Sequence, residues 1–363
     1  MYTIPSKLGP QAKERHEFID AERIRQGVIR MFKVNFSLAE GERVLILADV
    51  PTAELWNKLD AEELGSQFRR SLLAKYVKEI GEKAFPRNIF RFVPFPATGL
   101  NGSEPTMGVG EELLKADVAV ALTSYSITHT KARNTATSAG VRVASMPGFD
   151  PEMFYEGGVM AADYLSIAEK TLQVRDAMEG VSKVEISTST GTNLSFRIDG
   201  REKFAETGLI ERYNRACNLP AGEAACSPVE GSANGTIIVE KGWHKLADED
   251  AELGIEDGLI CKLSGPKLFV QRFVELLRPD SNEEPFRSRR NVAEFGIGTN
   301  PNAKRADNTL EAEKIEGTVH IGYGNNYFMG GTVNADFHSD FVIPSPTVVF
   351  DGRVVMEKGR LVL

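Results

Sequence analysis

The sequence RVLILAD, at residues 43–49, indicates what kind of fold the N-terminal half of the chain adopts. It is a continuous apolar run directly after the turn-forming residues 40–42, which is typical of a strand inside a sheet. Helical patterns and three further strand-like runs then alternate along the chain, at residues 61–83, 88–95, 110–115, 117–124 and 141–146. This alternation predicts an α/β N-terminal domain with a mostly parallel, doubly wound sheet.

The pattern changes after residues 150–178, which read as one or two helices with a break at Gly157 and Gly158. Two alternating strand patterns, KVEISTS and NLSFRID, follow from Lys183, and the only long helical run beyond them is at residues 265–277. We therefore predict a second, α+β and strand-rich domain. With 363 residues, two domains are expected, and we place them at residues 1–180 and 181–363.

Composition excludes several classes of function. A formal net charge of −8 argues against a nucleic-acid partner, because phosphate binding needs clustered Lys and Arg. No run of about 18 apolar residues or apolar signal core is present, so we expect a cytoplasmic protein that binds no membrane. The three cysteines, Cys217, Cys226 and Cys261, form no C-x-x-C pair and are expected to be reduced, packed thiols.

Two of the five histidines stand near the C-terminus beside unusually placed polar residues. In FHSDFVI, residues 337–343, His338 and Asp340 alternate with apolar neighbours, so in a strand they share one face with Cα atoms about 6–7 Å apart. Two such side chains can converge on one metal ion, although a hydrogen-bonded surface pair is the alternative. A second strand-like run, GTVHIGYG at residues 317–324, carries His320 among glycines that permit close approach.

Two glutamates complete the candidate set of metal ligands. Glu223 ends the segment NLPAGE, and Glu294 lies in the mostly apolar segment VAEFGIGTN. A buried charge is costly unless it is paired or bound to metal, but an exposed loop position is the alternative for each glutamate. Imidazole with carboxylate oxygens suits Zn, Co, Mn or Fe better than Mg or Ca.

These segments, in this order, resemble the thermophilic metalloprotease family, the metallo-aminopeptidases of the aminopeptidase T and aminopeptidase S type. The resemblance extends over nearly the whole chain, because residues 126–130 and 142–148 also look like the N-terminal domain of that family. It implies a homodimer with two divalent metal ions, Zn, Co or Mn. The residues that it implies as metal ligands are Glu223, Glu294, His320, His338 and Asp340.

The resemblance also implies a reaction. Glu294 would bridge the ions, and Tyr327, seven residues after His320, matches the catalytic tyrosine of the family. Two ions about 3.5–4 Å apart can activate a shared water for attack on an amide, with Glu223 or Glu294 accepting its proton. We therefore predict a metal-dependent aminopeptidase-like hydrolase acting on a short peptide or small amide.

His129 is the predicted substrate-binding residue, because it follows the strand at residues 117–124. Ligand-binding groups of open α/β folds stand at this end of the sheet. The alternative is a helix-start residue hydrogen-bonded to a neighbour. His16 and His244 have no comparable context and are expected at the surface.

Two alternatives to the hydrolase remain open. Ring-cleaving dioxygenases of the dihydroxypyridine type look like distant relatives; they bind one Fe(II) through two histidines and an aspartate, with histidine where this chain has Glu294. A non-catalytic metal-binding homologue is the other alternative. The short interval between His320 and His338 leaves substrate size open, and Glu313 is a further candidate acid. Retention of Glu223 and Glu294 leads us to favour the hydrolase.

Overall fold

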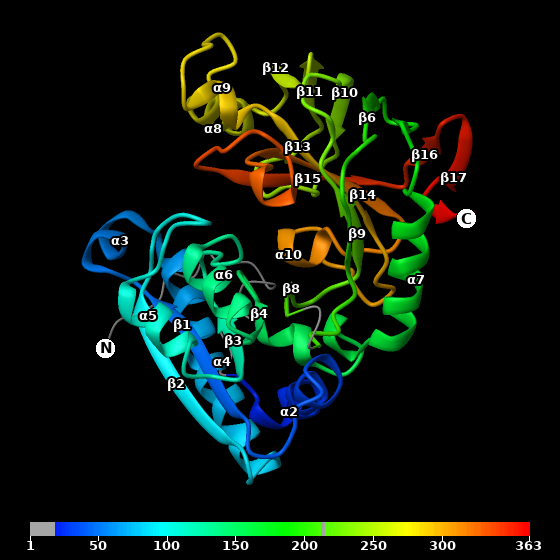
Figure 1. The fold of residues 1–363 in the computed structure, drawn as a ribbon. Helices are drawn as coiled ribbons and strands as arrows, with labels where there is room; N and C mark the ends of the chain where they lie inside the picture. The colour runs from blue at the N-terminus through cyan, green and yellow to red at the C-terminus, as the bar shows by residue number, and fades with distance from the viewer. Residues whose placement is uncertain (1–18, 212–214) are drawn as a thin grey trace.

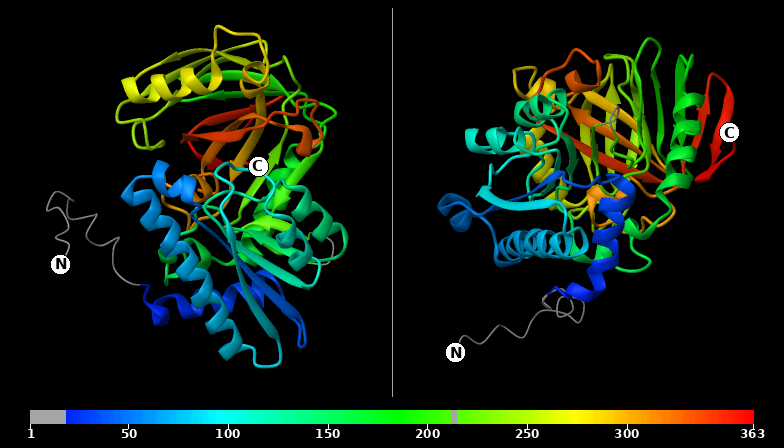
Figure 2. Two further views of the ribbon diagram at one scale, coloured as in Figure 1. Left: turned by 90° about the vertical axis from the view of Figure 1, so that its left-hand side faces the viewer. Right: turned by 60° about the horizontal axis from the view of Figure 1, so that its bottom comes forward.

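Three β-sheets organise the residues that the computed structural model describes, 19–211 and 215–363 (Figure 1). The elements drawn in blue to cyan form a layered α/β region, and most of the elements from green to red form a strand-rich region beside it. Figure 2 shows the two regions from two further directions. The predicted fold class, an α/β N-terminal part and a strand-rich C-terminal part, is confirmed.

The α/β region is built on a sheet of five parallel strands. In spatial order they are β2 (Ile89–Pro96), β1 (Arg43–Val50), β3 (Val118–Leu122), β4 (Arg142–Ser145) and β8 (Ala216–Asn218). On β1, Val44 and Ile46 pack into one hydrophobic core, whereas Leu45 and Leu47 pack into another. Because both faces of β1 are buried, its sequence is a continuous apolar run and not an alternating one.

Helices cover both faces of the parallel sheet, as a doubly wound sheet requires. Side chains of α2 (Ala21–Arg30) and α4 (Ala61–Ala84) belong to the first core. Those of α5 (Met107–Leu113) and α6 (Lys131–Ser138) belong to the core on the other face. Among residues 19–145, the other helical segments are α3 (Ala53–Lys58) and the π-helical turn η1 (Met31–Asn35).

Three helical segments lead from the parallel sheet to the strand-rich region. They are the 3-10 turns η2 (Pro151–Phe154) and η3 (Val159–Ala161) and the α-helix α7 (Tyr164–Ala177). Of the one or two helices expected at residues 150–178, α7 is the α-helix, and Gly157 and Gly158 lie between the two short turns. Although β8 follows these helices in sequence, it pairs with β4, so the chain returns to the parallel sheet after residue 180. The division into residues 1–180 and 181–363 stays a prediction.

Two antiparallel sheets form the strand-rich region and share one hydrophobic core. The larger sheet runs, in spatial order, β12 (Leu259–Ser264), β11 (Ala251–Glu256), β10 (Asn234–Val239), β6 (Asn193–Arg197), β5 (Lys183–Ser187), β16 (Thr347–Phe350), β17 (Arg353–Glu357) and β18 (Arg360–Leu361). The smaller sheet runs β15 (His338–Pro344), β14 (Thr318–Gly324), β13 (Val292–Gly298), β9 (Glu223–Cys226) and β7 (Lys203–Glu206). Phe196 and Phe295 join the sheets, with ring centroids 5.2 Å apart.

Short helical segments complete the strand-rich region: α8 (Lys267–Leu277), α9 (Phe286–Arg289), α10 (Thr309–Ala312) and η4 (Tyr327–Met329). The three cysteines are all unpaired, as expected. Within residues 19–211 and 215–363, no helix combines the length and the apolar character needed to cross a membrane.

Removing the Phe341 ring tests the packing that supports the smaller sheet. Phe341 is 2% exposed on β15, and its ring stacks on Tyr323 with centroids 4.8 Å apart. We expect Phe341→Ala to lower the free energy of unfolding by about 3–5 kcal/mol, because it leaves a cavity in the core. Urea denaturation measures the change. The control Leu268→Ala removes a side chain that is 68% exposed and should change stability little; equal effects would contradict the prediction.

Candidate metal centre

Four adjacent strands of the smaller sheet bring the predicted metal ligands to one face. Side chains alternate between the two faces of a strand, so residues such as Phe295, Ile321 and Phe341 point into the shared core, and their neighbours point the other way. The strands β9, β13, β14 and β15 thereby present, in order, Glu223, Glu294, His320, and His338 with Asp340. The structure brings together all five residues that the sequence pointed to.

Glycines on neighbouring strands make room for these side chains. Gly296 stands opposite His320, and a Cβ atom at Gly296 would lie 2.1 Å from His320 Cε1. Gly322 stands between Glu294 and Asp340, and a Cβ atom there would lie 2.7 Å from Asp340 Oδ1. A register irregularity between Val292 and Glu294 sets Glu294 opposite Gly322, in keeping with the tendency of bulges to re-aim side chains beside functional sites.

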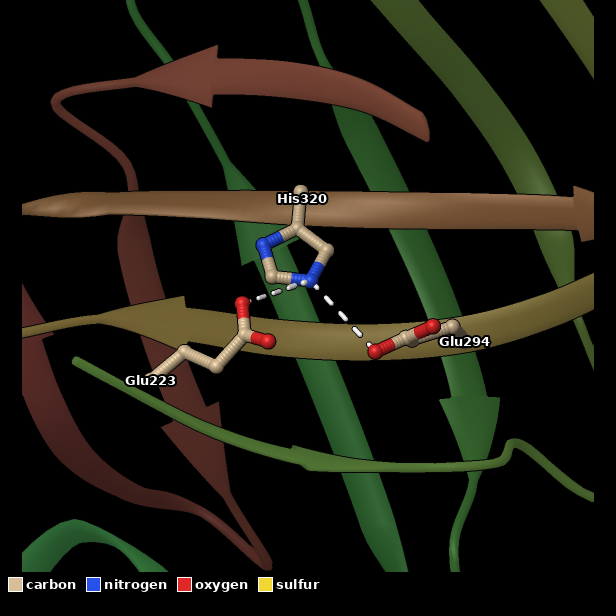
Figure 3. Close-up of side chains that lie close together, drawn as sticks. All are labelled: Glu223, Glu294 and His320. Carbon is tan, nitrogen blue, oxygen red and sulfur yellow. Dashed lines mark ion pairs between the residues drawn. The ribbon is translucent and has the colours of Figure 1, made fainter. Parts of the chain in front are cut away.

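Glu223, Glu294 and His320 form the first group of potential metal ligands, with one ligand atom of each within 4.8 Å of the others. Figure 3 shows the two carboxylates on either side of the His320 ring nitrogen. His320 Nε2 lies 3.5 Å from Glu223 Oε2 and 3.6 Å from Glu294 Oε1. Two oxygens and one nitrogen therefore face a common point.

Glu294, His338 and Asp340 form the second group, with the same limit of 4.8 Å between ligand atoms. His338 Nε2 lies 3.1 Å from Glu294 Oε2 and 3.5 Å from Asp340 Oδ1. The other ring nitrogen of His338, Nδ1, lies 2.8 Å from the backbone carbonyl oxygen of Asn325. If Nδ1 donates to this carbonyl, Nε2 is left free to bind metal, which is the usual arrangement of a metal-ligating histidine. Glu294 belongs to both groups and offers one oxygen to each.

The electrostatics of the cluster fit a bound cation. Burial opposes ionisation of Glu294, but hydrogen bonds from both imidazoles outweigh it and hold the pKa of Glu294 well below its usual value. Burial likewise opposes the charged form of His320, yet Glu294 and Glu223 raise its pKa to about 9. Opposite charges favour ionised forms in this way. The imidazoles and carboxylates of the cluster therefore stabilise each other's charged forms.

Unsatisfied buried atoms give a second test of the fit. Glu223 Oε2, His320 Nδ1 and Asp340 Oδ1 are buried and have no hydrogen-bond partner. Buried polar atoms normally have such a partner, and those that lack one often contact a bound ion or an ordered water. Two of these three atoms, Glu223 Oε2 and Asp340 Oδ1, are carboxylate oxygens that face the ring nitrogens of His320 and His338. The residues present therefore fit a divalent metal ion with nitrogen and oxygen ligands.

His129 reaches the metal cluster from the α/β region. It lies in the loop between β3 and α6, and its ring stacks on Phe328 with centroids 3.6 Å apart. The His338 ring centroid is 6.2 Å away. Burial, followed by repulsion from His338, lowers the pKa of His129 to about 3, so this imidazole is neutral. His129 is thus placed beside the site, and its substrate-binding role stays a prediction.

Tyr327 lies on η4 and is 67% exposed, and its predicted catalytic role stays a prediction. The next residue, Phe328, contacts the cluster, with its ring centroid 5.2 Å from that of His338. His244, expected at the surface, is partly exposed, and its ring packs against that of Phe273 with centroids 5.4 Å apart. His16 lies outside the described residues.

The sequence interpretation missed two charged residues behind Glu223. Lys314 is 2% exposed, with its Nζ atom 2.5 Å from Glu223 Oε1, and Glu206 lies on β7 directly opposite Glu223. Burial raises the pKa of Glu206 to about 7 and that of Glu313 to about 8. Glu313, a candidate acid from the sequence, contacts Lys314 and belongs to neither ligand group. In the sequence, Lys314 is a charged residue next to Glu313, and nothing in that pattern predicts that its side chain is buried.

A parallel α/β sheet beside an antiparallel sheet that brings imidazole and carboxylate side chains together is typical of a metal-dependent enzyme. The sequence model of one family, NicX: 2,5-dihydroxypyridine 5,6-dioxygenase, matches residues 36–363. The chain therefore belongs to the 2,5-dihydroxypyridine 5,6-dioxygenase (NicX) family. No curated protein sequence matches the chain.

Two of the solved structures that match this chain show the fold that they share with it. The 2,5-dihydroxypyridine dioxygenase of Pseudomonas putida KT2440 superposes with a TM-score of 0.72 at 16% identity, over 95% of this chain and 98% of that one. AmpT of Thermus thermophilus, an aminopeptidase T, superposes with a TM-score of 0.60 at 14% identity, over 94% and 99%. At such low identity, both similarities show the fold alone.

Family membership corrects the function predicted from the sequence. The metallo-aminopeptidase assignment, with its description as a hydrolase of peptide bonds, is wrong, because the family is one of dioxygenases. The catalytic roles assigned to Tyr327, Glu223 and Glu294 belonged to that hydrolase. The physical reason is that the ligand motifs specify a metal-binding sheet, and one fold can support unrelated reactions.

Replacing Gly322 by alanine tests whether close packing of the strands creates the metal site. A Cβ atom at Gly322 would meet Asp340 Oδ1 and Glu294 Cβ, both at 2.7 Å. We expect Gly322→Ala to weaken divalent metal binding about 10–100-fold, the usual cost of disturbing groups that orient metal ligands. Calorimetric titration of the metal-free protein measures the affinity. The control Gly108→Ala adds a Cβ atom with nothing within 4 Å, and equal affinities in both variants would contradict the prediction.

Proposed function

We propose that this protein is a metal-dependent dioxygenase that opens the ring of a hydroxylated pyridine or a similar small aromatic compound. The family match over residues 36–363 is the observation that carries the proposal. The ligand groups centred on Glu294 supply a place for the metal that such a reaction requires. The named substrate of the family suggests a dihydroxylated, nitrogen-containing ring as the first compound to test.

Divalent iron at the group of Glu294, His338 and Asp340 is the proposed cofactor. Two histidines and one carboxylate are the usual ligands of non-haem iron oxygenases, and this group has one histidine and two carboxylates. Both ligand types are common for iron, and His320 adds an imidazole 3.6 Å from the other oxygen of Glu294. Bound iron would supply the one-electron chemistry that oxygen activation needs.

The aromatic pair beside His338 supports a flat substrate. His129 and Phe328 stack at an interplanar angle of 22°, and both rings lie within 6.2 Å of the His338 ring by centroid distance. Flat rings favour stacked or edge-to-face contacts with such groups. A neutral imidazole at His129 also has one nitrogen that donates a hydrogen bond and one that accepts, which suits a ring hydroxyl.

An oxygen-consumption assay tests the proposed function. The protein is loaded anaerobically with Fe(II), mixed with 2,5-dihydroxypyridine, and followed with an oxygen electrode and by loss of substrate absorbance. We expect about one O₂ consumed per ring opened, because a dioxygenase places both oxygen atoms in the product. Asp340→Asn should abolish both signals by removing a ligand, whereas Asp199→Asn, an exposed acid paired with Arg197, should retain them.

If the iron-loaded protein consumes neither substrate nor oxygen with any member of a panel of hydroxylated pyridines and phenols, the proposal is contradicted. Release of amino acids from aminoacyl amides under the same conditions would also contradict it.

His129→Phe tests the proposed substrate contact. The variant keeps an aromatic ring to stack on Phe328 but removes both nitrogens. We expect an unchanged iron content and a kcat about 100-fold lower, within the range typical for loss of a positioned imidazole. Phe328→Leu is the matched variant that keeps His129 and removes the stacking partner, so it should raise KM more than it lowers kcat. A wild-type kcat in His129→Phe would exclude a role for the imidazole.

A further inference from the structure

A buried ammonium group lies behind the metal ligands and has no part in the proposed reaction. Lys314 follows α10, and its side chain is 2% exposed. Its Nζ atom lies 2.5 Å from Glu223 Oε1, 3.4 Å from Glu313 Oε2 and 3.5 Å from Glu206 Oε2. Three carboxylates thus surround one lysine, and one of them is a predicted metal ligand.

The backbone holds Lys314 in this position. Its carbonyl oxygen accepts a hydrogen bond from the Asn300 N–H at 2.8 Å, and its own N–H donates to the Glu311 carbonyl at 3.0 Å. Asn300 and Ile315 form an isolated bridge next to this segment. The ammonium group is therefore fixed beside the sheet, where a buried charge is stable only if it is paired with opposite charge.

The two oxygens of Glu223 face different groups, the Lys314 ammonium and the His320 ring. Oε1 is bound to Lys314, whereas Oε2 faces His320 Nε2 at 3.5 Å and has no hydrogen-bond partner. A divalent ion at the group of Glu223, Glu294 and His320 would have to share the Glu223 carboxylate with a fixed ammonium. Like charges on one carboxylate repel each other strongly where water is excluded. In the second group, Glu294, His338 and Asp340 form ion pairs with one another, and no lysine of the described part of the chain joins them.

We propose that the Lys314 ammonium takes the place of a second metal ion, so that the protein binds one divalent ion, at Glu294, His338 and Asp340. Lys314 is then a residue that determines metal stoichiometry. The inference rests on the proposed function in one respect: it takes Glu294, His338 and Asp340 as the residues that bind iron. It proposes one ion in place of the two expected from the sequence, because Glu223 already has the Lys314 ammonium as a partner.

A competing role for Lys314 is to orient Glu223 as a ligand of a second ion. The two roles predict opposite effects of removing the charge. If the ammonium replaces an ion, an uncharged side chain frees Glu223 and a second ion can bind. If the ammonium orients a ligand, the same change weakens or abolishes binding of that ion.

Metal counting with Mn(II) as the probe decides between these roles. The full-length protein is stripped with a chelator, titrated with Mn(II), and analysed by equilibrium dialysis with elemental analysis and by electron paramagnetic resonance. We expect one ion per chain in the wild type, with the signal of isolated Mn(II). Lys314→Met, which keeps the length of the side chain, should bind two ions and show the signal of a coupled pair. Lys262→Met, an exposed lysine paired with Glu252, is the control and should bind one.

Two ions per chain in the wild type would overturn the proposal, as would a folded Lys314→Met variant that binds one ion or none. Glu223→Gln provides a measurement that does not depend on the folding of Lys314→Met. It keeps a hydrogen-bond acceptor for Lys314, and the count should stay at one; loss of the ion would overturn the proposal. These ion counts need no substrate or oxygen. If the proposed reaction is wrong, the oxygen-consumption assay fails; if the proposed stoichiometry is wrong, the ion counts differ from those expected.

Discussion

The carboxylate of Glu294 is the group on which the site depends, because each of its oxygens faces a different imidazole. Oε1 lies 3.6 Å from His320 Nε2 and Oε2 lies 3.1 Å from His338 Nε2. The donors come from neighbouring strands, so this convergence requires the strands to approach without a side chain between them. Gly296 and Gly322 provide that space. The alternation that buries Phe295 and Ile321 on the opposite face then fixes the direction of the donors.

Much of this arrangement could be predicted from the sequence, because periodicity reports which face of an element is buried. The run at residues 43–49 became β1, and the alternation of His338 and Asp340 became two donors on one face of β15. Burial of Lys314 could not be predicted. It depends on Glu206 and Glu223, which are 108 and 91 residues away in the sequence and meet it only through the tertiary fold.

The reaction was the part of the interpretation that failed, and the reason is physical. Glu223, Glu294, His320, His338 and Asp340 describe an environment that attracts divalent cations, and both hydrolysis and oxygen chemistry use such environments. What separates these reactions is the number of ions and the shape of the space above them. Those properties depend on groups outside the ligand motifs, such as the rings of His129 and Phe328.

The return of the chain to the parallel sheet has a mechanical consequence. β8 ends at Asn218 and β9 begins at Glu223, so only residues 219–222 lie between the edge strand of the parallel sheet and the strand that carries Glu223. The position of Glu223 is therefore tied to the edge of the parallel sheet. The stacked rings of His129 and Phe328 form a second contact between the two regions, on the other side of the cluster from Lys314 and beside His338. A change in how the two regions pack would thus alter the surroundings of the cluster from both the Glu223 and the His338 ends.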